Sequence, residues 1–302
     1  MLFAFLTTLL WSFSAIFARR LVDVLGSTLA NFARLLVATG LLALWAFALG
    51  AGVRGDGFGW YVLSGVIGFG LGDITLYFAL ARLGSRLTIL LTQCLAAPFA
   101  ILLEWCWLGT MLTWAQLLCG AGVLLGVSFA LLPKDNPHLP RATLWSGIVF
   151  GVFAAIGQGL GAVVSRKAYA LSLDSGVVVD GGSAAFQRAL GGLVCGALAW
   201  WLLRRREAER PWSTLTKNLR LPRFTGTLFA AALFGPVVGV GCYQWALATA
   251  PSGVVLPIVA LCPVVIIPIS WWFEGDRPKP RSLFGGLIAV AAAIALARLR
   301  TP

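Results

Sequence analysis

The sequence is poor in charged residues, and poorest in acidic ones. Only 11% of its 302 residues are charged, and 11 acidic residues stand against 23 basic ones, whereas a soluble domain carries about 25% charged residues. Hydrophobic residues make up 59% of the chain, and the mean hydropathy is +0.90. This composition predicts an integral membrane protein with no sizeable soluble domain. We therefore expect any ligand to bind inside the membrane bundle.

The sequence also lacks the residues that metal sites and catalytic triads need. Its single histidine, His138, lies in a polar segment, and the six cysteines are scattered singly through apolar stretches without a Cys-x-x-Cys motif. Neither a zinc site nor a histidine-based triad can be built from this set. A Gly-x4-Gly-Lys-Ser/Thr loop is absent as well, so nothing indicates ATP-driven chemistry. We predict no enzyme activity, no metal and no cofactor.

The net charge of +12 does not indicate a nucleic-acid partner, because the basic residues gather in short segments beside apolar stretches. Such a distribution is typical of the orientation bias of membrane proteins, whose cytoplasmic loops are rich in lysine and arginine. One side of the predicted membrane carries 16 of these residues and the other side 5. The richer side, which includes the loop 204–223, is predicted to be cytoplasmic. Both termini are then expected to face outward.

Ten apolar stretches run along the chain, each close to the roughly 20 residues that a helix needs to cross the hydrocarbon. They predict an all-α integral membrane protein with ten transmembrane helices. The polar segment 134–143 contains two prolines and is predicted to be a linker between the halves 1–133 and 144–302. The predicted spans are 2–19, 28–50, 60–82, 87–108, 113–132, 144–166, 180–203, 225–248, 253–273 and 281–299.

The second five stretches resemble the first five. Because five is odd, the second copy enters the membrane from the opposite side, and the halves become two inverted five-helix repeats. Inverted repeats are typical of secondary transporters, which bind their substrate near the membrane midplane between the repeats. The matching segments are 32–34 with 186–188, 72–81 with 239–248, and 95–98 with 260–263.

Asp73 is the strongest functional candidate, because ionisable groups well inside a span are costly and usually functional. Its distance from Arg82 at the span end corresponds to a depth of about 14 Å, and Arg34 lies about 9 Å deep from the same side. The two side chains are placed to form an ion pair between neighbouring helices. Tyr77 shares the helical face of Asp73. The pattern fits a structural ion pair, and it also fits a carboxylate that binds a proton or a cation.

The segment 70–73 also matches the Gly-x-Gly-Asp signature of intramembrane aspartyl proteases. Such an enzyme needs a second aspartate that faces the first, so that one carboxyl stays protonated while the other activates water. Every other aspartate of this chain falls in a loop or near a predicted span end. The sequence therefore argues against proteolysis.

Arg188 is the counterpart of Arg34 in the second half. It is expected to bind an anionic substrate group such as a carboxylate, to extend toward the membrane interface, or to hold a helix carbonyl. Val240 lies near the position that corresponds to Asp73, so any acidic coupling site belongs to the first half. Other polar and aromatic residues within the spans are predicted to line a central cavity or to bond between helices. These are Gln93, Gln158, Tyr243, Gln244 and Trp245.

These features resemble the drug/metabolite transporter superfamily, in particular its EamA-like members, which have ten spans in two five-helix repeats. The first half departs from the family pattern, because Leu108-Gly109-Thr110 replaces the expected closing glutamate and Glu104 lies further inside the span. Glu104 and Glu274, near the ends of corresponding helices, are expected to be solvated. Relatives usually keep both termini in the cytoplasm, opposite to the charge-based orientation. The resemblance rests on Arg34, Arg188, the glycine-rich segment 70–80, Pro98, Pro263 and the segment 272–274.

The resemblance implies a secondary transporter that moves a small organic solute by alternating access. The hypothesis favoured here is an exporter of an amino acid or related metabolite in the inner membrane of a bacterium, with proton coupling through Asp73. Exchange of phosphorylated or nucleotide-linked sugars and lipid flipping are alternatives within transport. A membrane scaffold is the alternative outside it. Besides the solute, membrane lipids are the expected partners, and the sequence does not specify an oligomeric state.

Overall fold

The computed structural model describes residues 1–131, 140–203, 210–274 and 280–299, and all regular elements in these ranges are helical. The predicted all-α class is therefore confirmed. Seven helices are long and apolar enough to cross a membrane, and shorter apolar helices occupy the predicted fifth, ninth and tenth spans. The number of ten crossings stays a prediction. The seven long helices are Leu2–Leu25, Ser27–Ala48, Phe58–Ser85, Leu87–Leu108, Arg141–Asp174, Gly181–Leu203 and Pro222–Thr249.

In the first half, the predicted third and fourth spans meet in one long element. Gly84 has a φ of 73° and lies inside α4, where the chain bends between the two spans. A positive φ is accessible to glycine at little cost, because glycine has no Cβ. The elements are α1 (Leu2–Leu25), α2 (Ser27–Ala48), α3 (Phe58–Gly65), the π-helix η1 (Val66–Asp73), α4 (Ile74–Leu103), the π-helix η2 (Glu104–Leu108) and α5 (Trp114–Leu131).

In the second half, α6 already begins at Arg141, within the segment predicted to be the linker. Residues 134–139 of that segment lie outside the described ranges, so the division of the chain at the linker stays a prediction. The elements are α6 (Arg141–Asp174), α7 (Gly181–Leu203), α8 (Trp212–Asn218), α9 (Pro222–Ala232), the π-helix η3 (Leu233–Val237), α10 (Val238–Thr249), α11 (Ser252–Val259), α12 (Cys262–Glu274) and α13 (Pro280–Arg298).

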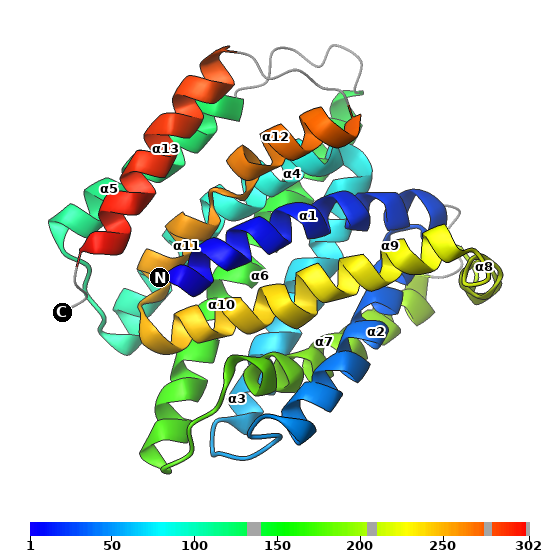
Figure 1. The fold of residues 1–302 in the computed structure, drawn as a ribbon, viewed down its shortest axis with the longest axis horizontal. Helices are drawn as coiled ribbons and strands as arrows, with labels where there is room; N and C mark the ends of the chain where they lie inside the picture. Colours follow the sequence, from blue (N-terminus) through cyan, green and yellow to red (C-terminus); the bar gives the residue numbers. More distant parts are fainter. Residues whose placement is uncertain (132–139, 204–209, 275–279, 300–302) are drawn as a thin grey trace.

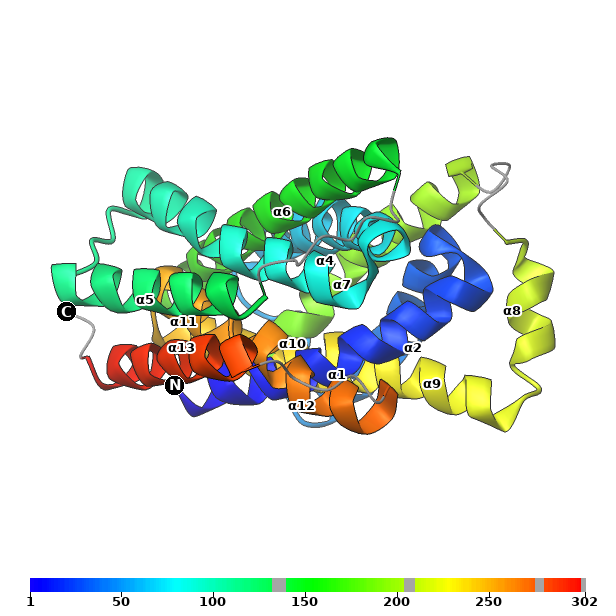
Figure 2. The ribbon, with the colours of Figure 1, turned by 90° about the horizontal axis from the view of Figure 1, so that it is seen from above.

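The two halves interlock rather than lying side by side. The first helix of each half packs on the third span of the other half: α1 contacts α9 and α10, and α6 contacts α3 and η1. The second helices, α2 and α7, pack against each other, and so do α5 and α13 at one side of the bundle. The N-terminus and the C-terminal end of α13 lie at the same end of the bundle (Figures 1 and 2). The central space is therefore bounded by helices from both halves.

Glycines allow α6 to approach η1 very closely. A Cβ added to Gly157 would lie 2.6 Å from the Cα of Gly72, and a Cβ added to Gly161 would lie 3.2 Å from the Cα of Gly68. Small residues at such positions let membrane helices pack backbone to backbone. The glycines of the segment 68–72 thus match those of α6 across the interface between the halves.

We expect Gly157→Ala to lower the free energy of unfolding by about 1–3 kcal/mol, because overpacking a tight contact costs about that much and the neighbouring atoms here belong to the backbone. The measurement is thermal or denaturant unfolding of the purified protein in detergent. Gly40→Ala is the matched control, since a Cβ at Gly40 in α2 would meet nothing within 4 Å. If both variants unfold like the wild type, the close packing of α6 on η1 is wrong.

Both third spans contain a π-helical segment, η1 in the first half and η3 in the second. Glycines at 68, 70 and 72 lie within η1, and Pro236, which has no N–H to donate, lies within η3. Such segments interrupt the regular hydrogen-bond ladder and are frequent at functional sites. Residues from both segments border the central space, so a binding site is expected there.

Candidate functional site

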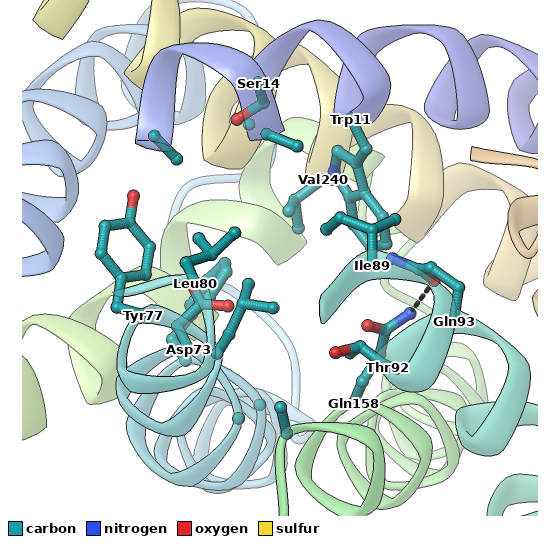
Figure 3. A pocket seen from close by; sticks show the side chains of 18 of the residues that line it. Trp11, Ser14, Asp73, Tyr77, Leu80, Ile89, Thr92, Gln93, Gln158 and Val240 are labelled. Atoms are coloured by element: carbon teal, nitrogen blue, oxygen red, sulfur yellow. Dashed lines mark hydrogen bonds between the residues drawn. The ribbon is translucent and has the colours of Figure 1, made fainter. Parts of the chain in front are cut away.

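A cavity of about 90 Å³ lies between the two halves. Since one water molecule needs roughly 10–15 Å³ by this kind of measure, the cavity has room for several waters or for part of a small solute. Its walls come from α1, α2, η1, α4, α6, α7, η3 and α10. Figure 3 shows side chains from these elements pointing toward a common space. The cavity is therefore built by both halves together.

Seven of the nine predicted site residues line this cavity. They are Arg34, Asp73, Tyr77, Gln93, Gln158, Arg188 and Tyr243. Gln244 and Trp245 are not among the lining residues, which corrects the prediction for these two. Successive residues of an α-helix point about 100° apart, so when Tyr243 faces the cavity its two successors face elsewhere. Trp245 instead stacks on Phe3, with the ring centroids 5.0 Å apart.

The ion pair between Arg34 and Asp73 is present, and it is largely withdrawn from solvent. Nη2 of Arg34 contacts Oδ2 of Asp73, and the two side chains are 7% and 17% exposed. The same nitrogen donates a hydrogen bond of 3.2 Å to Oδ1 of Asn31. The ring of Tyr77 lies 5.1 Å from the guanidinium carbon of Arg34. Helices α2 and α4 with η1 thus place a neutralised charge pair at the cavity wall.

Arg188 is buried in the same cavity wall without a comparable partner. It is 4% exposed, and its Nε and Nη1 atoms have no hydrogen-bond partner among the described residues. The ring of Phe69 lies 5.2 Å from the guanidinium carbon, a contact that uses the flat face of the guanidinium and none of its N–H groups. The alternative in which Arg188 extends toward the membrane interface is wrong, because the side chain lines the central cavity.

Uncharged polar groups complete the site. Nε2 of Gln158 donates a hydrogen bond of 2.7 Å to Oε1 of Gln93, which joins α6 to α4 across one end of the cavity (Figure 3). The hydroxyls of Tyr77 and Tyr243 are buried, and no described residue forms a hydrogen bond with either. Because a buried hydroxyl without a partner is costly, both groups are available to bind water or a solute.

Sequence reasoning missed part of the wall. Ser14 and Thr92 line the cavity, and so do the glycines at 68, 72 and 235. Ser14 belongs to a stripe of α1 at helical spacing that also contains Trp11 and Ala18. That spacing was the available signal, but single hydroxyl residues in apolar helices usually bond to their own backbone, so they do not stand out in a sequence.

The structure also corrects the prediction for Glu104, because this side chain is buried and has polar partners. It is 2% exposed, and its Oε1 lies 2.5 Å from Nε of Arg166. Its Oε2 accepts hydrogen bonds from the hydroxyl of Ser252 and from the Ser252 backbone N–H, the latter at 2.9 Å. Ser252 begins α11, where free N–H groups favour an anion. The side chain of Glu274, its counterpart, lies outside the described part of the structure.

Arg166 extends this junction to a further helix. Its Nη1 donates hydrogen bonds to the carbonyls of Leu247 and Ala250, at 3.1 and 2.5 Å, at the end of α10. Glu104 and Arg166 therefore tie η2, α6, α10 and α11 together. The junction lies beyond Gln93 and Gln158 along α4 and α6.

Comparisons with known proteins address the chain as a whole. A sequence model of the EamA-like transporter family matches residues 1–132 and 145–298. Solved structures provide 29 matching chains. One of them, described as "Crystal structure of protein", is 16% identical in sequence, covers 99% of this chain and 96% of its own, and superposes with a TM-score of 0.73. At this identity the likeness shows the fold alone. Among curated proteins, none matches the sequence.

Proposed function

Because the chain belongs to the EamA-like transporter family, and is therefore a membrane transporter of small solutes, we propose that the cavity between its halves is the solute-binding site. One observation carries this proposal: the cavity wall holds a neutralised pair, Arg34 with Asp73, and an unpaired cation, Arg188. Charges this deep in a membrane protein are costly and commonly mark a substrate or ion pathway. We place the protein in the inner membrane of a bacterium, where it exports an amino acid or a related metabolite.

Alternating access is the mechanism that the architecture favours. The solute site of an inverted-repeat transporter lies between the repeats, which exchange roles as the site opens to one side and then to the other. Here each half contributes its second-helix arginine to one cavity. The junction around Glu104 ties four elements together beyond one end of the cavity, and its opening is part of the proposed change between the two states.

Proton coupling through Asp73 is part of the proposal. Asp73 is the single carboxylate among the described residues that line the cavity. Protonation of this carboxyl would end its ion pair with Arg34 and leave the cavity more positive, which changes its affinity for a charged solute. Exchange of a proton for the solute then supplies the driving force from an ion gradient.

Lipid flipping is a second candidate, favoured by one feature. An apolar groove of about 680 Å³ lies between α4, α5 and α11, lined by residues such as Trp105 and Trp114. Among the described residues that line it, none is charged, whereas a headgroup that crosses the membrane needs polar partners along its path. The groove is also separate from the charged cavity, so solute export is the stronger proposal.

The test compares metabolites in the medium of bacteria that express the wild type, Asp73→Asn or an empty vector. We expect particular metabolites to accumulate outside only with the wild type, and Asp73→Asn to reduce this at least about ten-fold, a loss equivalent to about 1.4 kcal/mol. The matched control is Asp56→Asn, which changes an exposed loop carboxylate. Membrane levels are equalised by immunoblot. Equal profiles for wild type and vector would contradict export.

A further inference from the structure

The surroundings of Arg34 and Arg188 are related by the inverted repeat. Each guanidinium packs over a glycine in the third span of the other half. A Cβ at Gly235 would lie 3.0 Å from Nη1 of Arg34, and a Cβ at Gly68 would lie 2.6 Å from Nη2 of Arg188. These glycines correspond in the two repeats, since each lies four residues before the matching Gly72 or Gly239. The fold thus builds the same guanidinium site twice: Arg34 against Gly235, and Arg188 against Gly68.

The two guanidinium sites differ in the counter-ion. Asp73 directly follows Gly72 and pairs with Arg34. The residue that follows Gly239 is Val240, which also lines the cavity (Figure 3). The position that gives Arg34 its carboxylate therefore gives Arg188 an isopropyl group. The site of Arg188 therefore has a guanidinium but no equivalent of the Asp73 carboxylate that pairs with Arg34.

A buried guanidinium without a counter-ion needs an anion that also accepts hydrogen bonds. Arg188 is 4% exposed, and in the described ranges two of its three nitrogens, Nε and Nη1, find no hydrogen-bond partner. A buried charge is costly unless it is paired and hydrogen-bonded. The planar guanidinium presents parallel N–H groups that match the two oxygens of a carboxylate. The unpartnered hydroxyl of Tyr243 lines the same cavity and adds one more donor.

We propose that Arg188 binds a carboxylate of the transported solute, which takes the place beside Arg188 that Asp73 takes beside Arg34. This inference rests on the proposed function and specifies its substrate class. With Arg34 and Asp73 neutralising each other, the cavity carries one uncompensated positive charge, so a solute with a single carboxylate balances it. Val240 keeps the position free of a competing anion. Amino acids and simple organic acids share this chemistry.

The sharpest test gives Arg188 an internal counter-ion. Metabolites in the medium are compared for bacteria that express the wild type, Val240→Asp, Val240→Asn or an empty vector at matched membrane levels. The two variants have side chains of nearly equal size, and only the first carries a charge. We expect every compound released by the wild type to contain a carboxylate, and Val240→Asp to release at least ten-fold less than Val240→Asn.

Three results of this comparison separate the inference from the function on which it rests. Released compounds that lack an acidic group would establish export and overturn the inference. Equal release by Val240→Asp and Val240→Asn would also overturn it, because the added charge would then be without effect. No difference between wild type and vector would contradict the proposed function itself. The identity of the released compounds distinguishes amino acids from other organic acids.

Arg188→Gln provides a second test, because it removes the guanidinium itself and buries no new charge. Since Arg188 has no ion-pair partner in the part of the chain that the structure describes, its removal strands no carboxylate there. We therefore expect the unfolding temperature of the purified protein to stay unchanged or to rise, while release of the carboxylates falls at least ten-fold. A clear drop in unfolding temperature would assign Arg188 a structural partnership and overturn the inference. Release at the wild-type level would overturn it as well.

Discussion

Asp73→Ala should destabilise the protein by about 3–5 kcal/mol, the cost typical of removing one partner of a buried ion pair. The variant leaves the guanidinium of Arg34 only 7% exposed and without its carboxylate. The hydrogen bond to Asn31 and the ring of Tyr77 do not replace the lost negative charge. Denaturant unfolding of the purified protein in detergent measures the effect. An unfolding curve like that of the wild type would contradict a stabilising Arg34–Asp73 pair.

The double variant Arg34→Met with Asp73→Leu separates the structural role of the pair from its functional role. Replacing both partners of a buried ion pair by apolar residues is often neutral or stabilising, so we expect most of the lost stability to return. Export should stay at the level of the empty vector, because the carboxylate proposed to bind the proton is gone. A double variant that exports like the wild type would assign the pair to helix packing alone.

Glu104→Ala should cause a loss of similar size, about 3–5 kcal/mol, because it removes the buried partner of Arg166. Glu104 is also the acceptor for the first residue of α11, through the side chain and the backbone N–H of Ser252. One substitution therefore breaks contacts among three helical elements, η2, α6 and α11. The free energy of unfolding, measured as for Asp73→Ala, shows the loss directly.

Glu104→Gln is the matched control for this junction. The amide keeps one oxygen that can accept from Ser252 but has no charge for Arg166, so the loss should be smaller than for alanine. Equal stability of wild type and Glu104→Ala would contradict the junction. Equal losses for both variants would show that the charge pair with Arg166 contributes all of the effect and the hydrogen bonds to Ser252 none.

Gln93 and Gln158 show what a prediction from the sequence leaves open about geometry. Polar side chains inside apolar spans are costly, so the sequence marked both as residues of a cavity or of helix contacts. Their hydrogen bond joins residues 65 positions apart, and no local pattern reports which helices become neighbours. The same limit applies to Tyr243 and Gln244. Both were equally good candidates, and only the rotation of α10 against its neighbours placed the first in the cavity wall and the second outside it.

The amino-acid sequence by itself determined the membrane character, the positions of the apolar stretches, the repeat and the placement of Arg34 and Asp73 within apolar stretches. These properties follow from hydropathy and from the fixed rise of a helix, which act along the chain. Tertiary structure alone decided that Glu104 meets Arg166 and that Arg188 has no ion pair among the described residues, because both depend on which helices pack together. It also decided where π-helical segments interrupt the third spans, because close packing at glycines determines the backbone conformation there.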